Sequence, residues 1–365
     1  MRVLSVSTVH YPGDARVLHR QIKSLVDAGH HVTWAAPWSS VDASVTHVPD
    51  IERLDLPRSV GRRRLAGLRA ARSLVARVGP EHDVVIVHDP ELVVAIAGLD
   101  LPPVVYDVKE DTAAALSDKE WLPRPLRSVA AGGVRALERM AESRMLLMLA
   151  ETAYAERLEG NWPLVPNEAP VPQEQPDGPS GDPRVVYLGR VSRGRGADEL
   201  LELATLLPLG VRLEVLGWTD PALADEFAEA DRDGILRWWG QGWVANPVAL
   251  DRIQGAVAGL SLLHDEPNYR HSRPTKVAEY MSRAVPVITT PNREAVRMVG
   301  AARCGLVVPF GDPEATVEAV NTLLADPASA RTMGLPGHRA ALERYDWNLS
   351  GPRFVTQLEK WACER

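Results

Sequence analysis

The sequence predicts an α/β protein with two domains, each built on a parallel sheet. Short β-branched runs alternate with runs that carry apolar residues at helical spacing, which is typical of strands joined by crossover helices. The chain has 365 residues, which is long for one hydrophobic core and suits two. Between the halves, residues 166–183 contain six prolines and indicate an interdomain linker.

The predicted elements alternate regularly along the chain. In the first half, β-branched runs predict strands at 3–8, 31–36, 84–88 and 104–107, and helical spacing predicts helices at 15–28, 62–78, 90–97 and 126–141. In the second half, the same patterns predict strands at 184–188, 212–216, 235–239, 259–263 and 285–289, and a last helix at 347–363. We therefore expect a first domain over 1–170, a linker over 171–183, a second domain over 184–345 and a terminal helix within 346–365.

Composition excludes several classes of function. The net charge of −7 argues against general nucleic-acid binding, which requires a basic surface. Only two cysteines occur, Cys304 and Cys363, and this suits a reducing compartment. No apolar run approaches the ~18 residues that span a bilayer, and residues 1–9 have the pattern of a first strand instead of a signal peptide. We expect a cytoplasmic protein.

The most informative segment is 271–291, which combines an anion site with a buried strand. Pro274 is typical of a first helical turn, and the helix is expected to run from Thr275 to about residue 283. The free N–H groups and the dipole at its start favour a phosphate, and Lys276 adds a positive charge. Glu279 lies on the same helix, where it can accept hydrogen bonds from hydroxyls. The segment suits a nucleotide-diphosphate sugar.

A second anion site is predicted where the strand at 184–188 ends. The chain continues as Gly189-Arg190-Val-Ser-Arg-Gly-Arg195-Gly, a glycine-rich turn with fork-shaped oxyanion donors. The same turn partly resembles a dinucleotide-binding fingerprint, but Glu199 stands at the third glycine position and would repel a pyrophosphate. We therefore set NAD binding aside. The plain alternative for the turn is a solvated basic loop.

At these residues the chain resembles the retaining glycosyltransferases of family 4, which have the GT-B fold. Residues 272–281 match the family variant Ser-x-Pro-x-Lys-x-x-Glu-Tyr-Met, and residues 189–196 match Gly-Arg-x(3 or 4)-Lys-Gly with Arg195 at the lysine position. The resemblance extends over nearly the whole chain. It implies two Rossmann-like domains facing a cleft, with the terminal helix crossing back to pack on the first domain. Ligands are then expected at the carboxyl ends of the strands.

The resemblance also implies a role for segments of the first domain. His10-Tyr-Pro-Gly13-Asp14 follows the first strand, Asp89 follows the strand at 84–88, and Lys109-Glu110 follows the strand at 104–107. These residues are implied to bind the acceptor. Asp14 has an alternative, because an aspartate before a helix is often its N-cap.

Two positions depart from the family pattern. Glu279 stands at the second motif glutamate, implied to bind the ribose, but the first motif glutamate is replaced by His271. Relatives usually have Tyr-Asp-x-His-Glu where this chain has Lys109 in place of the histidine. Both residues are implied to face the transferred sugar. The departures leave sugar choice open and allow either an anionic ligand or weakened catalysis.

The combined prediction is a metal-independent glycosyltransferase that moves a hexosyl group from a nucleotide-diphosphate sugar, with UDP favoured, to an acceptor hydroxyl with retention of configuration. No cofactor is expected beyond the nucleotide sugar. Catalysis would consist of positioning and of stabilising the departing diphosphate. The residues expected to take part in catalysis are Arg190, Arg195, Lys276, His271 and Lys109. Those expected to bind the donor are Gly189, Arg190, Arg195, Ser272, Pro274, Thr275, Lys276 and Glu279.

Two other functions remain open. A nucleotide-sugar-binding protein without transferase activity would explain the changes at His271 and Lys109. A GT-B sugar-nucleotide epimerase would also use the arginines of the glycine-rich turn. Residues 272–281 favour the transferase.

Two further patterns have plain structural alternatives. The predicted helix at 62–78 carries six arginines beside leucines, which allows a weak peripheral contact with an anionic membrane, although a solvated helix face explains it as well. Asp231-Arg-Asp233 imitates a metal-binding Asp-x-Asp, and we expect a surface loop there and no metal site. The sequence does not indicate an oligomeric state.

Overall fold

The computed structural model describes residues 1–40, 49–109, 124–156, 158–239, 244–266, 269–270 and 273–364, without the side chains of 124–131. The chain divides into two compact units. The first unit comprises Met1–Asn167 together with Leu349–Arg365, and the second comprises Glu168–Asn348. Each unit is described here by itself.

The first unit is a parallel sheet flanked by helices. Within the described residues, its six strands have the order β3-β2-β1-β4-β5-β6. The strands are β1 (Arg2–Val6), β2 (His31–Ala36), β3 (Glu52–Asp55), β4 (Val84–Val87), β5 (Val104–Val108) and β6 (Leu146–Leu149). The helices are η1 (Val17–Ile22), α1 (Lys23–Asp27), η2 (Trp38–Ser40), η3 (Gly61–Arg63), α2 (Arg64–Val78), η4 (Gly79–Glu81), α3 (Pro90–Ala95), α5 (Arg124–Arg144) and α6 (Thr152–Ala155).

The second unit repeats the same plan. Its six described strands have the order β12-β11-β10-β7-β8-β9, and all are parallel. The strands are β7 (Arg184–Leu188), β8 (Arg212–Leu216), β9 (Arg237–Trp238), β10 (Ala258–Ser261), β11 (Val287–Thr289) and β12 (Gly305–Val307). The helices are η5 (Arg193–Arg195), α7 (Ala197–Leu206), η6 (Pro221–Leu223), α8 (Ala224–Arg232), α9 (Asn246–Ile253), α10 (Thr275–Ser282), α11 (Arg293–Ala302), α12 (Pro313–Ala325) and α13 (Pro327–Arg344).

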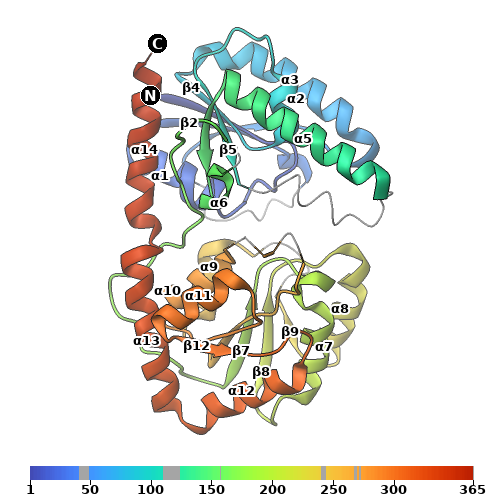
Figure 1. Cartoon of the computed structure of the whole chain (residues 1–365), viewed down its shortest axis with the longest axis vertical. Coiled ribbons are helices and arrows are strands. Elements are labelled where there is room, and N and C mark those ends of the chain that lie inside the picture. The colour runs from blue at the N-terminus through green and yellow to red at the C-terminus, as the bar shows by residue number, and fades with distance from the viewer. Residues whose placement is uncertain are drawn as a thin grey trace. The chain divides into compact units, whose positions relative to one another are not determined.

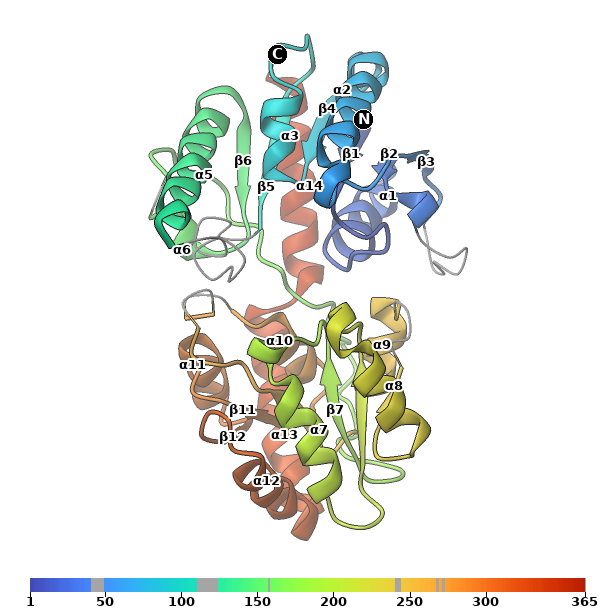
Figure 2. The same cartoon turned by 90° about the vertical axis from the view of Figure 1, so that its right-hand side faces the viewer.

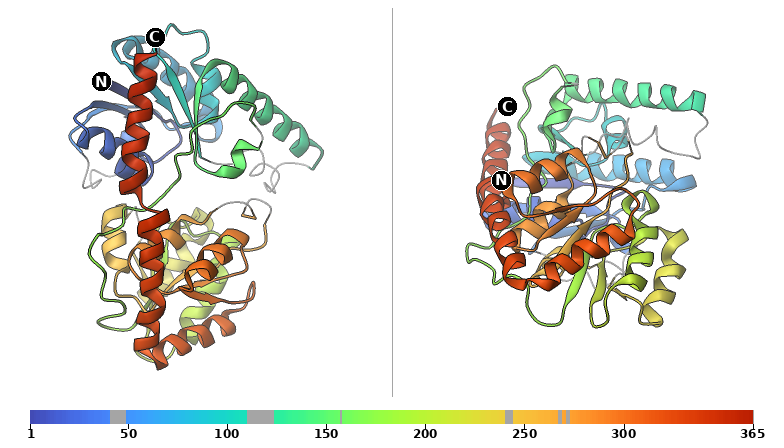
Figure 3. Two further views of the ribbon diagram at one scale, coloured as in Figure 1. Left: turned by 60° about the vertical axis from the view of Figure 1, so that its left-hand side comes forward. Right: turned by 60° about the horizontal axis from the view of Figure 1, so that its bottom comes forward.

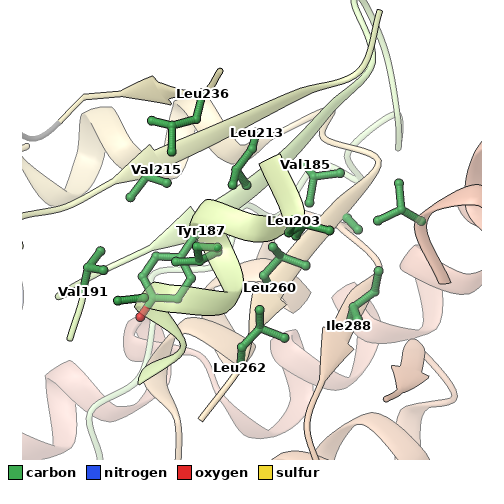
Figure 4. Packing of buried hydrophobic residues seen from close by; sticks show 14 of the residues in the cluster. Val185, Tyr187, Val191, Leu203, Leu213, Val215, Leu236, Leu260, Leu262 and Ile288 are labelled. Carbon is green, nitrogen blue, oxygen red and sulfur yellow. The ribbon is translucent and has the colours of Figure 1, made fainter. Parts of the chain in front are cut away.

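Each sheet carries a core on the faces that its helices cover. In the first unit, α2, α3 and α5 supply apolar side chains such as Val75 and Leu92 to one core (Figures 1 and 2). In the second unit, one core lies beneath α7, α8 and α12, and another beneath α9, α10, α11 and α13. Figure 4 shows Tyr187, Leu203 and Leu260 packed in the first of these two cores. β-Branched strands are buried on both faces, as expected for parallel sheets.

The last helix, α14 (Trp347–Cys363), begins in the second unit and continues in the first. In the first unit it lies near α1 (Figures 1 and 3), where Glu359 pairs with His30 at 3.0 Å. Residues 171–183, expected as a linker, are counted with the second unit. Val171 N donates to Asp346 Oδ1 at 3.0 Å, and Ser180 N donates to Gly255 O at 2.9 Å, so this segment packs on that unit despite its prolines.

The predicted strands at 31–36, 184–188 and 212–216 coincide with β2, β7 and β8. Three strands were not predicted: β3, β6 and β12. β3 reads Glu-Arg-Leu-Asp and is largely exposed at a sheet edge, so it has no apolar pattern, and β12 is a three-residue edge strand, Gly-Leu-Val, too short to show one. β6 reads Leu-Leu-Met-Leu and lacks the β-branched residues on which the prediction relied.

Candidate functional site

Both units place their candidate residues where the strand order reverses. In the first sheet the chain moves from β1 outward to β3 and then returns to β4 on the other side of β1. In the second sheet it does the same from β7 to β9 and then to β10. Loops at the carboxyl ends of such neighbouring strands diverge and leave room for a ligand. The candidate residues of both units follow these strands.

Asp89 organises the loop that follows β1. Its carboxylate accepts hydrogen bonds from the Ser7 hydroxyl at 2.9 Å and from Thr8 N at 2.5 Å, and it is only 1% exposed. His10 Nε2 lies 3.4 Å from the same carboxylate. Because these bonds occupy its oxygens, Asp89 holds the loop in place, and His10 is the more exposed member of the pair.

Asp14 lies at the start of η1, after a turn that contains Gly13 and is closed by a bond from Asp14 N to Tyr11 O at 2.9 Å. Its Oδ1 accepts from the backbone N–H groups of Arg16 and Val17, both at 3.0 Å, which is the capping role that the sequence left open. Burial would raise the pKa of Asp14, but the charge of Lys109 foremost, with other neighbours, lowers it to about 2.

Lys109 follows β5 in the same region of the first unit. Its Nζ is shielded from solvent and has no hydrogen-bond partner among the residues that the structure describes. The electrostatic influence of this ammonium on Asp14 shows that the two groups are neighbours. The structure thus places His10, Gly13, Asp14, Asp89 and Lys109 at one end of the first sheet.

A buried polar network beneath these residues received no role in the sequence analysis. Arg16 and Asp107 form a two-pronged pair, with Nε–Oδ2 at 2.9 Å and Nη2–Oδ1 at 2.6 Å. Burial would raise the pKa of Asp107, but Arg16 and His88 hold it well below its usual range. Arg16 occurs in the motif after the first strand and Asp107 in the Tyr-Asp pair, so a search for paired charges in those motifs could have found them.

His88 connects this network to β1. Its Nδ1 lies 3.2 Å from Asp107 Oδ2, and its Nε2 lies 2.8 Å from Ser5 Oγ. This is the connectivity of a Ser-His-Asp hydrolase, but all three side chains are at most 2% exposed. A substrate cannot reach the serine, so the network supports the loop residues above it. Burial lowers the pKa of His88 and keeps the imidazole neutral.

In the second unit, Arg190 stands at the end of β7 beside the continuation of β8. Its Nε donates to Asp220 Oδ1 at 2.9 Å, and its guanidinium lies 4.9 Å from the centre of the Trp218 ring. The Arg190 side chain remains 42% exposed. Gly189 has φ of +103°, a conformation that favours glycine and that lets the chain turn at the strand end. The sequence analysis missed Trp218 and Asp220, which no motif marked.

Arg195 ends the one-turn helix η5, and Gly196 follows with φ of +88°. The Arg195 guanidinium lies 5.5 Å from the centre of the Tyr269 ring. Tyr187, buried in the core of Figure 4, donates its hydroxyl to the carbonyl oxygens of Arg190 and Arg195 at 2.9 and 3.3 Å. The glycine-rich turn is therefore held in place at two of its three arginines.

Lys276 lies in the first turn of α10 and is 7% exposed. Its Nζ is 3.4 Å from the centre of the Tyr187 ring and has no hydrogen-bond partner among the described residues. Burial first, and then repulsion by Arg195, lower the pKa of Lys276 well below its usual range, against a smaller opposing effect of Glu279. A buried ammonium without an acceptor is unfavourable, so the site is short of negative charge.

Glu279 is 5% exposed and accepts a hydrogen bond from Asn246 Nδ2 at 3.0 Å. Asn246 opens α9 and was not predicted, although Asn-Pro at a helix start is a recognisable signal. Pro274 precedes α10 in extended conformation, and Thr275 is the first residue of the helix, as predicted. The second unit thus gathers Gly189, Arg190, Arg195, Pro274, Thr275, Lys276 and Glu279 around the ends of β7 and β10.

Three predicted site residues, His271, Ser272 and Glu110, lie outside the described residues. Asp231, in the Asp-x-Asp pattern, accepts a hydrogen bond from Trp238 N at 3.0 Å and pairs with Arg237 at 3.4 Å. It therefore joins α8 to β9 as a structural group. No helix in the described part of the chain combines the length and apolar character needed to cross a membrane.

Comparisons with known proteins identify the class of fold. Residues 182–326 match the family described as Glycosyl transferases group 1. Over its full length the structure resembles the sucrose-phosphate synthase of Thermosynechococcus elongatus, with a TM-score of 0.72, 18% identity and coverage of 99% of this chain and 98% of the other. HepE from Anabaena, solved with UDP and glucose, gives a TM-score of 0.69 at 15% identity, with coverage of 99% and 100%. The fold is the two-domain α/β GT-B fold.

The relatives found by sequence match a shorter part of this chain. An alpha-maltose-1-phosphate synthase of Mycolicibacterium smegmatis is 27% identical over 173 residues, which are 45% of this chain and 44% of the relative. The chain thus matches less than half the length of that curated relative. The family match lies in the second unit, and the resemblance of the whole structure to the two solved proteins shows the GT-B fold.

Proposed function

We propose that this protein is a retaining hexosyltransferase of family 4 that takes its sugar from a nucleotide diphosphate, with UDP favoured, and passes it to an acceptor hydroxyl. The observation that carries the proposal is the uncompensated positive charge at the end of β7. Lys276 is buried beside Arg195 at the start of α10, with no hydrogen-bond acceptor in the described part of the chain, and the helix dipole adds to the same potential. A bound diphosphate would neutralise this charge.

The residues on and near α10 also suit the other parts of a bound nucleotide. Glu279 lies one turn after Lys276 and is oriented by Asn246, so a ribose next to the diphosphate would find a buried carboxylate acceptor for its hydroxyls. Arg190 is held by Asp220 and stacked on Trp218, which presents its guanidinium in a fixed direction. The solved structure of HepE with UDP-glucose supports UDP as the first donor to test.

The mechanism that we propose uses positioning and leaving-group stabilisation. As the bond from the sugar to the diphosphate breaks, negative charge grows on the leaving oxygen, and Arg190, Arg195 and the start of α10 stabilise it. Lys276, which is buried, adds positive charge near the diphosphate. The acceptor hydroxyl would attack from the face that the diphosphate leaves, which retains configuration without a covalent intermediate. Fixed cations supply the charge that a metal ion would otherwise provide, so we propose metal independence.

The first unit would bind the acceptor. His10, Asp14 and Lys109 form a charged set above the rigid Arg16–Asp107 pair, with hydrogen-bonding groups of both kinds. Lys109 stands where family relatives have histidine, and His271 stands where they have glutamate. A protein that bound nucleotide sugars without transferring them would keep the donor site and lose turnover at these two positions.

The test is calorimetric titration of the purified full chain with UDP, GDP, ADP, dTDP and their hexose conjugates, with hydrolysis of each donor followed by release of free sugar. We expect one diphosphate to bind, its sugar to be released slowly without an acceptor, and chelator to leave both unchanged. Binding without hydrolysis, and without transfer to any tested hydroxyl, would favour the non-catalytic binding protein. Appearance of an epimerised nucleotide sugar would favour the epimerase, and no binding of any nucleotide would exclude the donor site.

The helix α2 leads to a smaller proposal about location. All its arginines are exposed, and Leu65 among them is 68% exposed, although Arg72 is occupied by the carbonyls of Ala95 and Ala97. We propose a weak contact between this face and anionic lipid. Sedimentation with phosphatidylglycerol vesicles at low salt should retain part of the wild-type protein and less of Leu65→Ser, and phosphatidylcholine vesicles should retain neither.

A further inference from the structure

A cavity of about 260 Å³ opens in the second unit at the carboxyl ends of β10, β11 and β12, outside the residues assigned to the nucleotide. Its walls come from the three loops that follow these strands: His264, Asp265 and Arg270 after β10, Asn292 and Arg293 after β11, and Phe310 after β12. The carboxyl ends of parallel strands are where ligands of such sheets bind. Its volume is just below the roughly 300–1,000 Å³ of sites for larger ligands, so it suits a single ring.

Phe310 gives the cavity an apolar wall. It is 39% exposed, whereas the other two phenylalanines of the chain, Phe227 and Phe354, are at most 1% exposed. Two of the three phenylalanine rings are therefore buried in the core, whereas the ring of Phe310 lies at the surface of the cavity. Aromatic faces are slightly negative and attract the polarised C–H groups that a sugar ring presents on one side.

His264, which also lines the cavity, is held in a fixed orientation. Its Nε2 lies 2.6 Å from Glu199 Oε1, and its backbone N donates to Gly194 O at 3.0 Å. A carboxylate that accepts from one imidazole nitrogen fixes the tautomer and leaves the other nitrogen for a further partner. Glu199 has no part in the nucleotide site proposed above. Glu199 therefore orients His264, a side chain that has no role in the proposed donor binding.

Asp265 and Arg270 neutralise each other at the wall, which also carries the guanidinium of Arg293 as a donor. Asp265 and Arg270 pair at 2.9 Å and present an acceptor and a donor side by side. Hydroxyl groups both donate and accept, so neighbouring hydroxyls of a sugar ring match such a pair.

We propose that this cavity binds one hexopyranose unit, with Phe310 against its C–H face and His264, Asp265 and Arg270 hydrogen-bonded to its hydroxyls. The proposal rests on the proposed function, which supplies the reason that sugars are present. The ring belongs either to a carbohydrate acceptor or to the transferred group of the donor. Both sources present the same chemistry to the cavity.

The experiment is a saturation-transfer NMR titration of the full chain with the methyl α-glycosides of glucose, mannose, galactose and N-acetylglucosamine, with calorimetric UDP affinity as an independent readout. We expect at least one glycoside to bind wild type with millimolar affinity. Phe310→Ala should weaken it about fivefold, the value of one aromatic contact. Phe310→Trp, which keeps a ring, and Val307→Ala, which removes exposed apolar surface from β12, should preserve it.

Competition identifies the source of the ring. If the cavity holds the transferred sugar, UDP-hexose displaces the glycoside and UDP alone does not. If it holds an acceptor sugar, the glycoside stays bound with either nucleotide. Absence of glycoside binding, or equal binding by wild type and Phe310→Ala, would overturn the subsite even where UDP binds. Glycoside binding that depends on Phe310 without any nucleotide binding would support the subsite and overturn the proposed function.

Discussion

The two units share one strand order but differ in how their buried charged side chains are paired. At the end of the first sheet, Arg16 is matched by Asp107 in a two-pronged pair, and the charge of Lys109 compensates Asp14, although the Lys109 Nζ, like that of Lys276, has no hydrogen-bond partner among the described residues. At the end of the second sheet, Lys276 has no hydrogen-bond acceptor among the residues that the structure describes, and the repulsion by Arg195 exceeds the attraction by Glu279. A compensated site serves as a rigid support in the free protein. An uncompensated site gains stability only when an anion binds, and this is why we assign the nucleotide diphosphate to the second unit.

The largest expected effect is the loss of a compensating charge in the first unit. Arg16→Met leaves Asp107 buried without its partner and should destabilise the protein by about 3–5 kcal/mol, because removal of one member of a buried pair leaves the other unpaired. Urea unfolding followed by circular dichroism measures this change. The double variant Arg16→Met/Asp107→Leu should recover part of the stability. An unchanged midpoint in the single variant would show that the pair does not support the first unit.

The next effect concerns catalysis in the second unit. Arg190→Ala removes an oxyanion donor and should lower kcat by about 10²–10³-fold, as for other donors to developing negative charge. Initial rates with the donor found by titration measure the loss. Asp220→Asn is the matched control, because it loosens Arg190 without removing its charge, and it should lose much less. Near-normal turnover in Arg190→Ala would exclude this residue from the reaction.

The third prediction is a gain in stability, whereas the first is a loss. Lys276→Met removes a buried amine that has no acceptor among the described residues, so we expect the free protein to become more stable by about 1–3 kcal/mol. The same variant should bind the nucleotide diphosphate at least tenfold more weakly. Unfolding midpoints with and without nucleotide measure both changes. A destabilised Lys276→Met protein would contradict the contrast between the two units.

The smallest effect is the pH dependence of stability, which differs between the units. The pKa values of Asp14 and Asp107 are lowered, so their contribution is fully present above their unfolded value of 3.8 and is lost as the pH falls toward 2. The pKa of His88 is also lowered, so the unfolded chain takes up a proton first below about pH 6.5 and acid destabilises the fold further. His88→Gln should remove the part of this component that His88 contributes, measured as a smaller loss of unfolding free energy below pH 6.5, and leave the part from His338, whose pKa burial also lowers.

Lys276 gives the second unit a dependence at alkaline pH. Its pKa is lowered from 10.5, so the folded chain releases this proton before the unfolded chain, and stability rises with pH between the two values. The stability difference between Lys276→Met and wild type should therefore narrow as the pH rises. Nucleotide binding should also be accompanied by proton uptake, measured by titration in buffers of different ionisation enthalpy. A constant difference and no proton uptake would show that Lys276 stays charged.

Local patterns in the sequence were sufficient where the chemistry is local. The segment around Thr275–Glu279 predicted a helix that starts at Thr275 and carries Lys276 and Glu279, and the structure has this helix. Glycine after β7 predicted a turn, and Gly189 has the positive φ that glycine allows. Strands that depend on their position in the sheet, such as the exposed β3, were missed because their residues carry no apolar pattern.

The sequence by itself determined the fold class and the residue types of the two sites, because alternating patterns and strand-end motifs depend on neighbours in the chain. Only the tertiary structure decided which charges are compensated. Arg16 and Asp107 are 91 residues apart, and Asn246 and Glu279 are 33 apart, so no local pattern predicts their contacts. Burial decides the rest: Lys276 would be an ordinary solvated lysine on an exposed helix, and its position over the Tyr187 ring makes it a buried cation without an acceptor.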